Sequence, residues 1–212
     1  MKKIDMHYNG LSGQVYVYIK QMILSGELKA GEKIYEEKVG QLFGVSRTPI
    51  REALKKLSEY GLVNLKPRSH AVVAALTREE AIQLAHIRAQ LEGLSAKLLA
   101  EVGTTRDFNY LDGIAEECDA LIAEKDVARA FEKDSMLHLE IARRTKNAHL
   151  YEIIEKLDAK IQLARLIIKL PIDRLESFIN QHTVIIQAFR KRDRELSETL
   201  MKHHILHQLS YF

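Results

Sequence analysis

The sequence predicts a mainly α-helical chain of two domains, a winged helix-turn-helix at residues 1–75 and an antiparallel α-helical bundle at residues 76–212. Three observations predict this fold. A basic helical segment lies between a short supporting helix and a β-rich hairpin, the order typical of a winged helix. Beyond the hairpin, apolar residues recur only at helical spacing, and cap residues divide them into six segments. A length of 212 residues also suits two domains of ordinary size.

The first domain opens with helical segments and closes with a hairpin. Apolar periodicity predicts helices at residues 14–25 and 35–43, each followed by a glycine that can end it. Two β-rich runs are expected to pair around a basic tip that holds Arg68 and His70. These runs are Leu62–Leu65 and Ala71–Val73.

The basic helix between these elements has the features of a DNA-reading helix. Ser46 is a candidate N-cap, and Gly61 can supply the left-handed stop. Arg47, Arg51 and Lys55 follow one another at i, i+4 and therefore share one outward stripe. Such a stripe fits the major groove, where arginine bridges O6 and N7 of guanine and also reaches phosphate. The alternative is a surface helix that is basic without binding DNA.

The stretch GELKAGEKIYEEKVGQLFGVSRTPIREALKKLSEYGLV resembles the winged-helix domain of the GntR family of bacterial transcription regulators. The likeness covers about residues 11–74, and its most specific part is VSRTPIREAL. It implies that Arg47, Thr48 and Arg51 contact operator DNA. The family usually has glycine at the wing position held by His70 and a basic residue where Glu37 stands. Further candidate contacts on the helix and wing are Ser46, Lys55, Arg68 and His70.

Charge and composition agree with a DNA-binding domain followed by a second domain of another kind. Residues 1–76 carry 12 Lys/Arg against 7 Asp/Glu, whereas residues 77–212 carry 20 against 22. Cys118 is the only cysteine, so no internal disulfide is possible. The chain lacks an apolar leader, and its apolar runs are far shorter than the roughly 20 residues of a membrane span. We therefore expect a cytoplasmic protein with no membrane partner.

The second domain is predicted to consist of six helices joined by short connections, which favour antiparallel neighbours. Thr77 and Glu80 stand in capping-box register at its start, and Pro171 separates the fourth helix from the fifth. Further cap candidates are Thr104, Asp126, Asn147, Asp173 and Asp193. The expected spans are 78–101, 105–124, 127–145, 148–169, 174–191 and 194–211.

The first helix of the bundle carries an apolar stripe and a charged pair. The stripe is expected to form either core or a dimer seam, and it consists of Leu84, Ile87, Leu91, Leu94 and Leu98. Arg88 and Glu92 stand at i, i+4. They form either a solvated ion pair or an interior site where Arg88 receives a carboxylate ligand.

Polar residues occupy positions that periodicity assigns to the interior of the bundle. Asp134 and His138 interrupt the inner stripe of the third helix at i, i+4, and His182 interrupts that of the fifth helix. The last helix offers three further imidazoles, those of His203, His204 and His207. A carboxylate and several imidazoles that converge suit a divalent transition metal, with zinc as first choice and nickel or manganese as alternatives. The competing interpretation is a hydrogen-bonded polar core without metal.

The bundle resembles the FCD ligand-binding domain that is attached to one large GntR subfamily, over about residues 77–208. Four pieces carry the likeness: Arg88-x3-Glu92, Asp134-x3-His138 with Asn147 following, His182 leading to Asp193, and Met201-x2-His204. The resemblance implies four metal ligands, Asp134, His138, His182 and His204, and its spacing from Asp193 selects His204 over His203. It also implies an effector that is a small carboxylate or sugar acid, for which Arg88 is the candidate binding residue.

These features together predict a ligand-responsive transcription regulator rather than an enzyme. We expect a homodimeric repressor that binds a palindromic operator in double-stranded DNA and senses its effector at the metal. The alternative from another class is a metal-dependent enzyme that acts on a small organic acid. A third possibility is a constitutive DNA-binding protein whose metal is purely structural.

Overall fold

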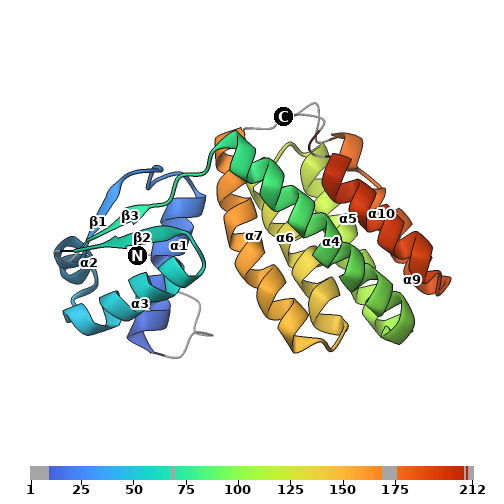
Figure 1. Cartoon of the computed structure of the whole chain (residues 1–212), viewed down its shortest axis with the longest axis horizontal. Coiled ribbons are helices and arrows are strands. Elements are labelled where there is room, and N and C mark those ends of the chain that lie inside the picture. The colour runs from blue at the N-terminus through green and yellow to red at the C-terminus, as the bar shows by residue number, and fades with distance from the viewer. Residues whose placement is uncertain (1–9, 68–69, 169–175, 208, 210–212) are drawn as a thin grey trace. The chain divides into compact units, whose positions relative to one another are not determined.

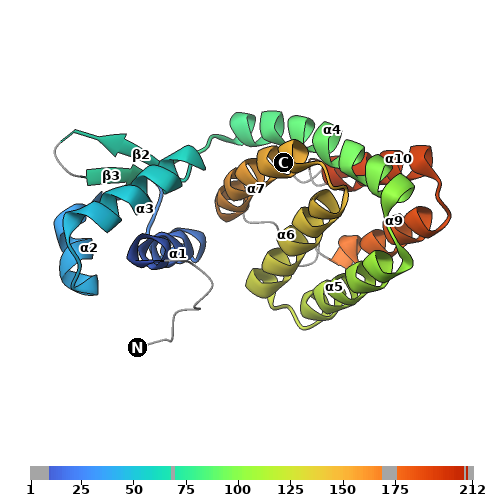
Figure 2. The same ribbon diagram turned by 90° about the horizontal axis from the view of Figure 1, so that it is seen from below.

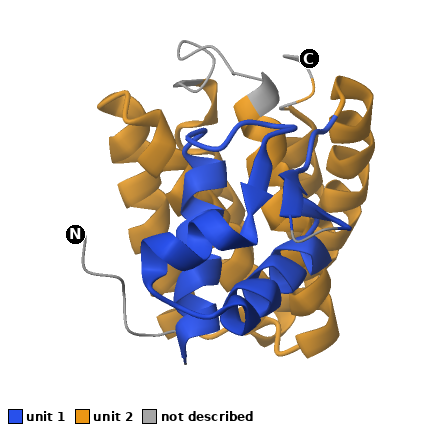
Figure 3. Ribbon diagram, turned by 90° about the vertical axis from the view of Figure 1, so that its left-hand side faces the viewer, with its two compact units in different colours: residues 1–76 blue, residues 77–212 orange. Residues whose placement is uncertain are grey.

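The computed structural model describes residues 10–67, 70–168, 176–207 and 209 of a mainly helical chain. The chain divides into two compact units, Met1–Leu76 and Thr77–Phe212 (Figure 3). Among the helices described, none combines the length and the apolar character that crossing a membrane requires.

The first unit is built on a helix whose apolar face matches the prediction. The buried residues of this helix, α3, are Ile50, Ala53, Leu54 and Leu57, and both preceding helices pack against it. Ser46 occupies the expected N-cap position in extended conformation, but its side chain makes no capping hydrogen bond, so the predicted hydroxyl cap is wrong. The helices are α1 (Leu11–Leu24), α2 (Glu36–Phe43) and α3 (Arg47–Glu59) (Figure 1).

A small antiparallel sheet completes this unit. Its strands lie in the order β1-β3-β2, with Ile34 opposite Ala71 in one pair and Leu65 opposite Ala71 in the other. The sequence predicts the β2–β3 hairpin but not β1, because three residues are too few to reveal a periodicity. The strands are β1 (Lys33–Tyr35), β2 (Val63–Lys66) and β3 (His70–Val73).

The second unit is a bundle in which each short connection reverses the chain (Figures 1 and 2). Helix α4 packs against α10, α7, α6 and α9, while α5 packs against α6 and α9. The capping boxes at Thr77 and Thr104 are present, and Asp126 accepts a hydrogen bond from the backbone of Arg129. The helices are α4 (Arg78–Val102), α5 (Thr105–Ala123), α6 (Val127–Arg144), α7 (Ala148–Ile168), α9 (Gln181–Arg190) and α10 (Arg194–His207).

The predicted helix at 174–191 is interrupted. A 3-10 turn, η1 (Glu176–Phe178), precedes α9, and Asn180 between them has a left-handed φ of 67°. An α-helix cannot continue through a residue in that conformation. The Asp119 carboxylate accepts a hydrogen bond of 3.1 Å from the backbone N–H of Asn180, which stabilises the break. The predicted cap Asp173 and the break at Pro171 lie outside the described residues.

Helix α4 buries a different face from the one that its leucines suggest. Its buried apolar positions are mostly alanines, namely Ala81, Ala85, Ala89, Ala96 and Ala100, together with Leu99. Ile87 is 54% exposed and Leu94 is 41% exposed, so the interpretation of the leucine stripe as core is wrong for these two residues. Small residues let neighbouring helices approach closely, and a Cβ at Gly93 would meet the side chain of Lys202 on α10 at 2.7 Å.

We expect opposite effects on stability from two glycine-to-alanine substitutions. Gly103, which ends α4, has no room for a Cβ, because that atom would lie 2.7 Å from the carbonyl oxygen of Leu99 and 2.6 Å from the ring of Phe108. Gly103→Ala should lower the free energy of unfolding by about 1–3 kcal/mol. Gly113 in α5 faces open space, so Gly113→Ala should raise it by about 0.5–1 kcal/mol. Urea unfolding monitored by circular dichroism measures both, and equal effects would contradict this packing.

Candidate metal centre and DNA-reading surface

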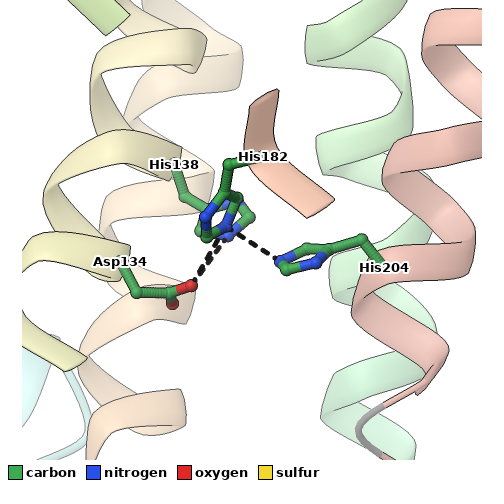
Figure 4. A group of neighbouring side chains, drawn as sticks. All are labelled: Asp134, His138, His182 and His204. Atoms are coloured by element: carbon green, nitrogen blue, oxygen red, sulfur yellow. Dashed lines mark hydrogen bonds and ion pairs between the residues drawn. The ribbon is translucent and has the colours of Figure 1, made fainter. Parts of the chain in front are cut away.

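Four side chains from three helices meet inside the bundle (Figure 4). Asp134 and His138 project from one face of α6, His182 from α9 and His204 from α10. All four residues are buried, and the ligand atoms they offer lie within 4.8 Å of one another. His203, the neighbouring candidate on α10, is exposed. The structure thus brings together the four residues that the resemblance to the FCD domain implied as a set.

The spacing of three pairs of these atoms suits a single metal ion. Nε2 of His182 lies 3.1 Å from Nε2 of His204 and 3.3 Å from Oδ1 of Asp134. Nε2 of His138 lies 3.4 Å from the same oxygen. Two ligands bound about 2.1 Å from one ion are about 3.0–3.4 Å apart at octahedral or tetrahedral angles. Three imidazole nitrogens and a carboxylate oxygen also form a donor set that divalent transition metals accept, so the residues fit such an ion.

Neighbouring side chains orient two of the imidazole rings. The Glu92 carboxylate on α4 contacts Nδ1 of His138, and Oε1 of Gln181 lies 2.8 Å from Nδ1 of His204. A partner on Nδ1 leaves Nε2 as the ligating nitrogen, which is how metal-binding histidines are usually held. Nε2 of His138 is buried and faces Oδ1 of Asp134 inside the cluster. The sequence indicated Glu92 only as a partner of Arg88 and did not indicate Gln181.

Before a metal binds, Asp134 and His204 favour the protonation states that can ligate, whereas His138 favours its protonated form and would have to release a proton to the solvent. Burial would raise the pKa of Asp134, but Arg165 and His138 hold that pKa well below its ordinary value, so the carboxylate is ionised. Burial and the neighbouring His182 lower the pKa of His204 well below its ordinary value, so this imidazole is neutral. Burial would also lower the pKa of His138, but the carboxylates of Glu92 and Asp134 raise it. Ionised carboxylate and neutral imidazole are the forms that ligate.

Arg165 on α7 is a charged member of this cluster that the sequence analysis missed. Its guanidinium contacts Oδ2 of Asp134, and its Nη1 lies 3.3 Å from Oγ of Ser135 and 3.3 Å from the carbonyl oxygen of Phe131. Because Arg165 holds Oδ2, the other oxygen of Asp134 is the one that faces the histidines. The signal that could have revealed it is a cation within the apolar run that ends α7.

Arg88 is inside the bundle, not on its surface. It is 2% exposed, and its Nε lies 2.5 Å from Oε1 of Glu92. Of the two alternatives, the solvated ion pair is therefore wrong and the interior position is confirmed, and the two residues pair inside the bundle. Nη2 of Arg88 lies 3.9 Å from Oδ2 of Asp134 and makes no hydrogen bond within the described part of the chain. A buried guanidinium with an unused donor beside the cluster is suited to receive an anion.

The candidate DNA contacts are mostly on the surface of α3. Ser46, Arg47, Thr48 and Lys55 are exposed. His70 on β3 is half-buried, and its ring lies 5.8 Å from that of Tyr35, measured between centroids. The remaining wing candidate, Arg68, lies outside the described residues.

Arg51 is both exposed and held by a neighbouring helix. Its side chain is 59% exposed, and its Nε lies 3.0 and 3.1 Å from the two carboxylate oxygens of Glu36, the first residue of α2. Glu36 itself is buried. No sequence pattern indicates this pair, since its members are fifteen residues apart and on different helices.

Comparison with known families and proteins agrees with this architecture. The family model described as bacterial regulatory proteins, gntR family, matches residues 11–73, and the FCD domain model matches residues 83–207. An uncharacterized HTH-type transcriptional regulator, YdhC, from Bacillus subtilis is 27% identical over 93% of this chain and 89% of its own length. The gluconate operon transcriptional repressor of Bacillus licheniformis is 27% identical over 84% of this chain and 75% of its own length.

Solved structures support the same fold. Escherichia coli McbR/YncC superposes with a TM-score of 0.83 at 22% identity and covers 95% of this chain and 96% of its own. The two family models together span nearly all of the described residues, one on each compact unit. The chain therefore belongs to the gntR family of bacterial regulatory proteins, in the branch that carries an FCD domain, and is a DNA-binding transcription regulator rather than an enzyme.

Proposed function

We propose that this chain is a cytoplasmic, homodimeric repressor whose hold on operator DNA changes when a small carboxylate or sugar acid binds at a metal ion in the bundle. The observation that carries the proposal is the buried convergence of Asp134, His138, His182 and His204 in the FCD unit of a gntR-family regulator. The gluconate operon repressor among the relatives supports a sugar acid as effector.

The charges around the cluster favour an anionic effector. Once they ligate, the three imidazoles are neutral, so with the Asp134 carboxylate they supply one negative charge against the two positive charges of a divalent ion. When bound, the ion would supply Lewis-acid positions, two of which stay open if it is octahedral. Nη2 of Arg88, which lies near Asp134, would donate a hydrogen bond to the second oxygen of the effector's carboxylate. Zinc is our first choice for the ion, with nickel or manganese as alternatives, since imidazole suits several of these metals.

The exposed apolar residues of the bundle support a dimer seam. Ile87 and Leu94 on α4 are exposed, and so is Ile153 on α7, a helix that packs against α4. A two-fold dimer of this bundle would carry two reading helices, which matches a palindromic operator. In each subunit, Arg47, Thr48, Arg51 and Lys55 of α3 would enter the major groove.

We expect loss of metal and of effector response together in His182→Ala. The control is His203→Ala, because His203 lies on α10 next to a proposed ligand but is exposed. Elemental analysis of protein purified without chelator or affinity tag should find metal in the wild type and in His203→Ala only. Metal that persists in an Asp134→Ala/His182→Ala double variant would contradict the assignment.

The effector is tested by thermal shift of metal-loaded protein against sugar acids such as gluconate and against small hydroxy acids. A ligand that binds only the folded state stabilises it by about 2.7 kcal/mol at a hundredfold excess over Kd. Arg88→Ala should remove this stabilisation and keep operator binding without effector. No stabilisation by any acid, with metal bound, would favour a purely structural metal.

The reading helix is tested by the Arg47→Ala/Arg51→Ala variant. Each lost base contact should weaken operator binding by about 1–3 kcal/mol, and the dependence of affinity on salt should become less steep if phosphate contacts are lost. Fluorescence anisotropy at several salt concentrations measures both quantities. Arg106→Ala, an exposed arginine of the bundle, is the control and should behave as wild type. Unchanged operator affinity in the double variant would contradict the assignment.

The dimer seam is tested by Leu94→Glu, which places a charge in the exposed stripe of α4. We expect a shift to monomer in analytical ultracentrifugation, because an unpaired charge is costly to bury in an interface. Val184→Glu is the matched control, since Val184 on α9 is 48% exposed and lies outside the stripe. If both variants dimerise as the wild type does, the seam lies elsewhere.

A further inference from the structure

The reading helix carries an arginine that a buried carboxylate of another helix holds in place. Both carboxylate oxygens of Glu36 on α2 lie about one hydrogen-bond length from Nε of Arg51 on α3, at 3.0 and 3.1 Å. The side chain of Glu36 is 8% exposed, whereas that of Arg51 is 59% exposed. Glu36 is therefore buried in the first unit, and the arginine that it holds lies on the surface of that unit.

We propose that Glu36 is a positioning residue that holds Arg51 in the orientation needed to read a guanine, and so contributes to the choice of operator sequence. The inference rests on the proposed role of Arg51 in DNA binding and adds a residue that would not itself contact DNA.

The chemistry of the guanidinium group allows both contacts at once. Guanidinium is a rigid planar fork in which the two Nη atoms form the end and Nε shares a side edge with one of them, so an end-on contact through both Nη atoms does not need Nε. A bidentate contact with O6 and N7 of guanine uses two of these donors and leaves Nε for a carboxylate. The carboxylate of Glu36 therefore does not compete with the base.

When Glu36 holds the side chain of Arg51, it favours contacts with a base more than it raises the affinity for DNA of any sequence. A long side chain that is already ordered loses less conformational freedom when it binds. A loosely held arginine can reach a phosphate instead, and phosphate contacts carry no sequence information. The gain from Glu36 should therefore appear in the preference for one base pair more than in the affinity for DNA in general.

A tie between α2 and α3 with no role in recognition is the competing explanation, and the neighbouring residue allows the two to be separated. Glu37 follows Glu36 in the first turn of α2 and is exposed. Glu36→Gln and Glu37→Gln each remove one negative charge from the same turn. Any general electrostatic effect on DNA binding should therefore be shared by both variants.

The experiment uses the full-length chain and an operator selected from random duplex DNA by the wild-type protein. In one guanine pair of this operator, the base pair is replaced by another. The preference is then the Kd for the altered operator divided by the Kd for the intact operator. The pair used is the one at which Arg51→Ala lowers this ratio most. Glu36→Gln should lower this preference about two- to tenfold. Glu37→Gln should keep it, and adding Glu36→Gln to Arg51→Ala should change it no further.

Each remaining outcome overturns a defined part of the argument. Equal preferences in Glu36→Gln and Glu37→Gln, or a further loss from Glu36→Gln in the Arg51→Ala background, would mean that Glu36 acts only on structure or charge. If Arg51→Ala keeps full preference at every pair, the proposed role of Arg51 fails first. Should Glu36→Gln not fold, Glu36→Asp keeps the charge, shortens the reach and should show the same loss of preference.

Discussion

The second unit depends on the cost of burying the carboxylate of Asp134. A carboxylate removed from water is unfavourable unless charged or hydrogen-bonding partners compensate for it. Here one oxygen is held by Arg165, and the other faces the imidazoles of His138 and His182. These partners come from α6, α7 and α9, so the positions of three helices are linked through a single side chain. A shift of α7 along its axis would separate Asp134 from Arg165, and a shift of α9 would separate it from His182, so either shift would weaken the compensation of this buried charge.

The same network explains how the histidines can be gathered before a metal binds. Glu92 and Gln181 hold the outer nitrogens of His138 and His204, so the rings do not depend on a metal ion for their orientation. In small metal-dependent domains the binding energy of the ion is spent largely on folding. This bundle has an extensive apolar core around α4, α5, α9 and α10 in addition to the polar cluster. Metal binding here would therefore adjust a folded bundle rather than create one.

Local signals were sufficient for much of this structure. Capping boxes at Thr77 and Thr104 and the glycine after α2 mark helix ends within a few residues of where they lie. Helical periodicity also placed Asp134 and His138 in the interior. The choice of His204 over its neighbour came from resemblance to a family, and the exposure of His203 agrees with that choice.

The parts that sequence reasoning missed depend on contacts between distant residues. The break before α9 is held by Asp119, which lies 61 positions from Asn180, and Arg165 reaches its partner over 31 positions. Neither contact produces a periodic pattern in the sequence. Of the two alternatives for the apolar stripe of α4, the core was wrong for Ile87 and Leu94, because close helix packing favours alanine over the larger leucine. In both cases the structure depends on how neighbouring helices pack together, and the sequence of one helix alone does not reveal that packing.

Helix α4 is the element through which the binding of an effector could change the affinity for DNA. It carries Arg88 and Glu92, which contact Asp134 and His138 of the candidate metal cluster, and it also carries the exposed residues of the proposed dimer seam. Only four residues separate its first residue, Arg78, from the end of the last strand of the winged helix. An effector alters an equilibrium only if it binds one arrangement better than another. An effector carboxylate that draws Arg88 away from Glu92 would act on α4. Because α4 also carries the proposed dimer seam and begins directly after the DNA-binding unit, both could respond to the same change.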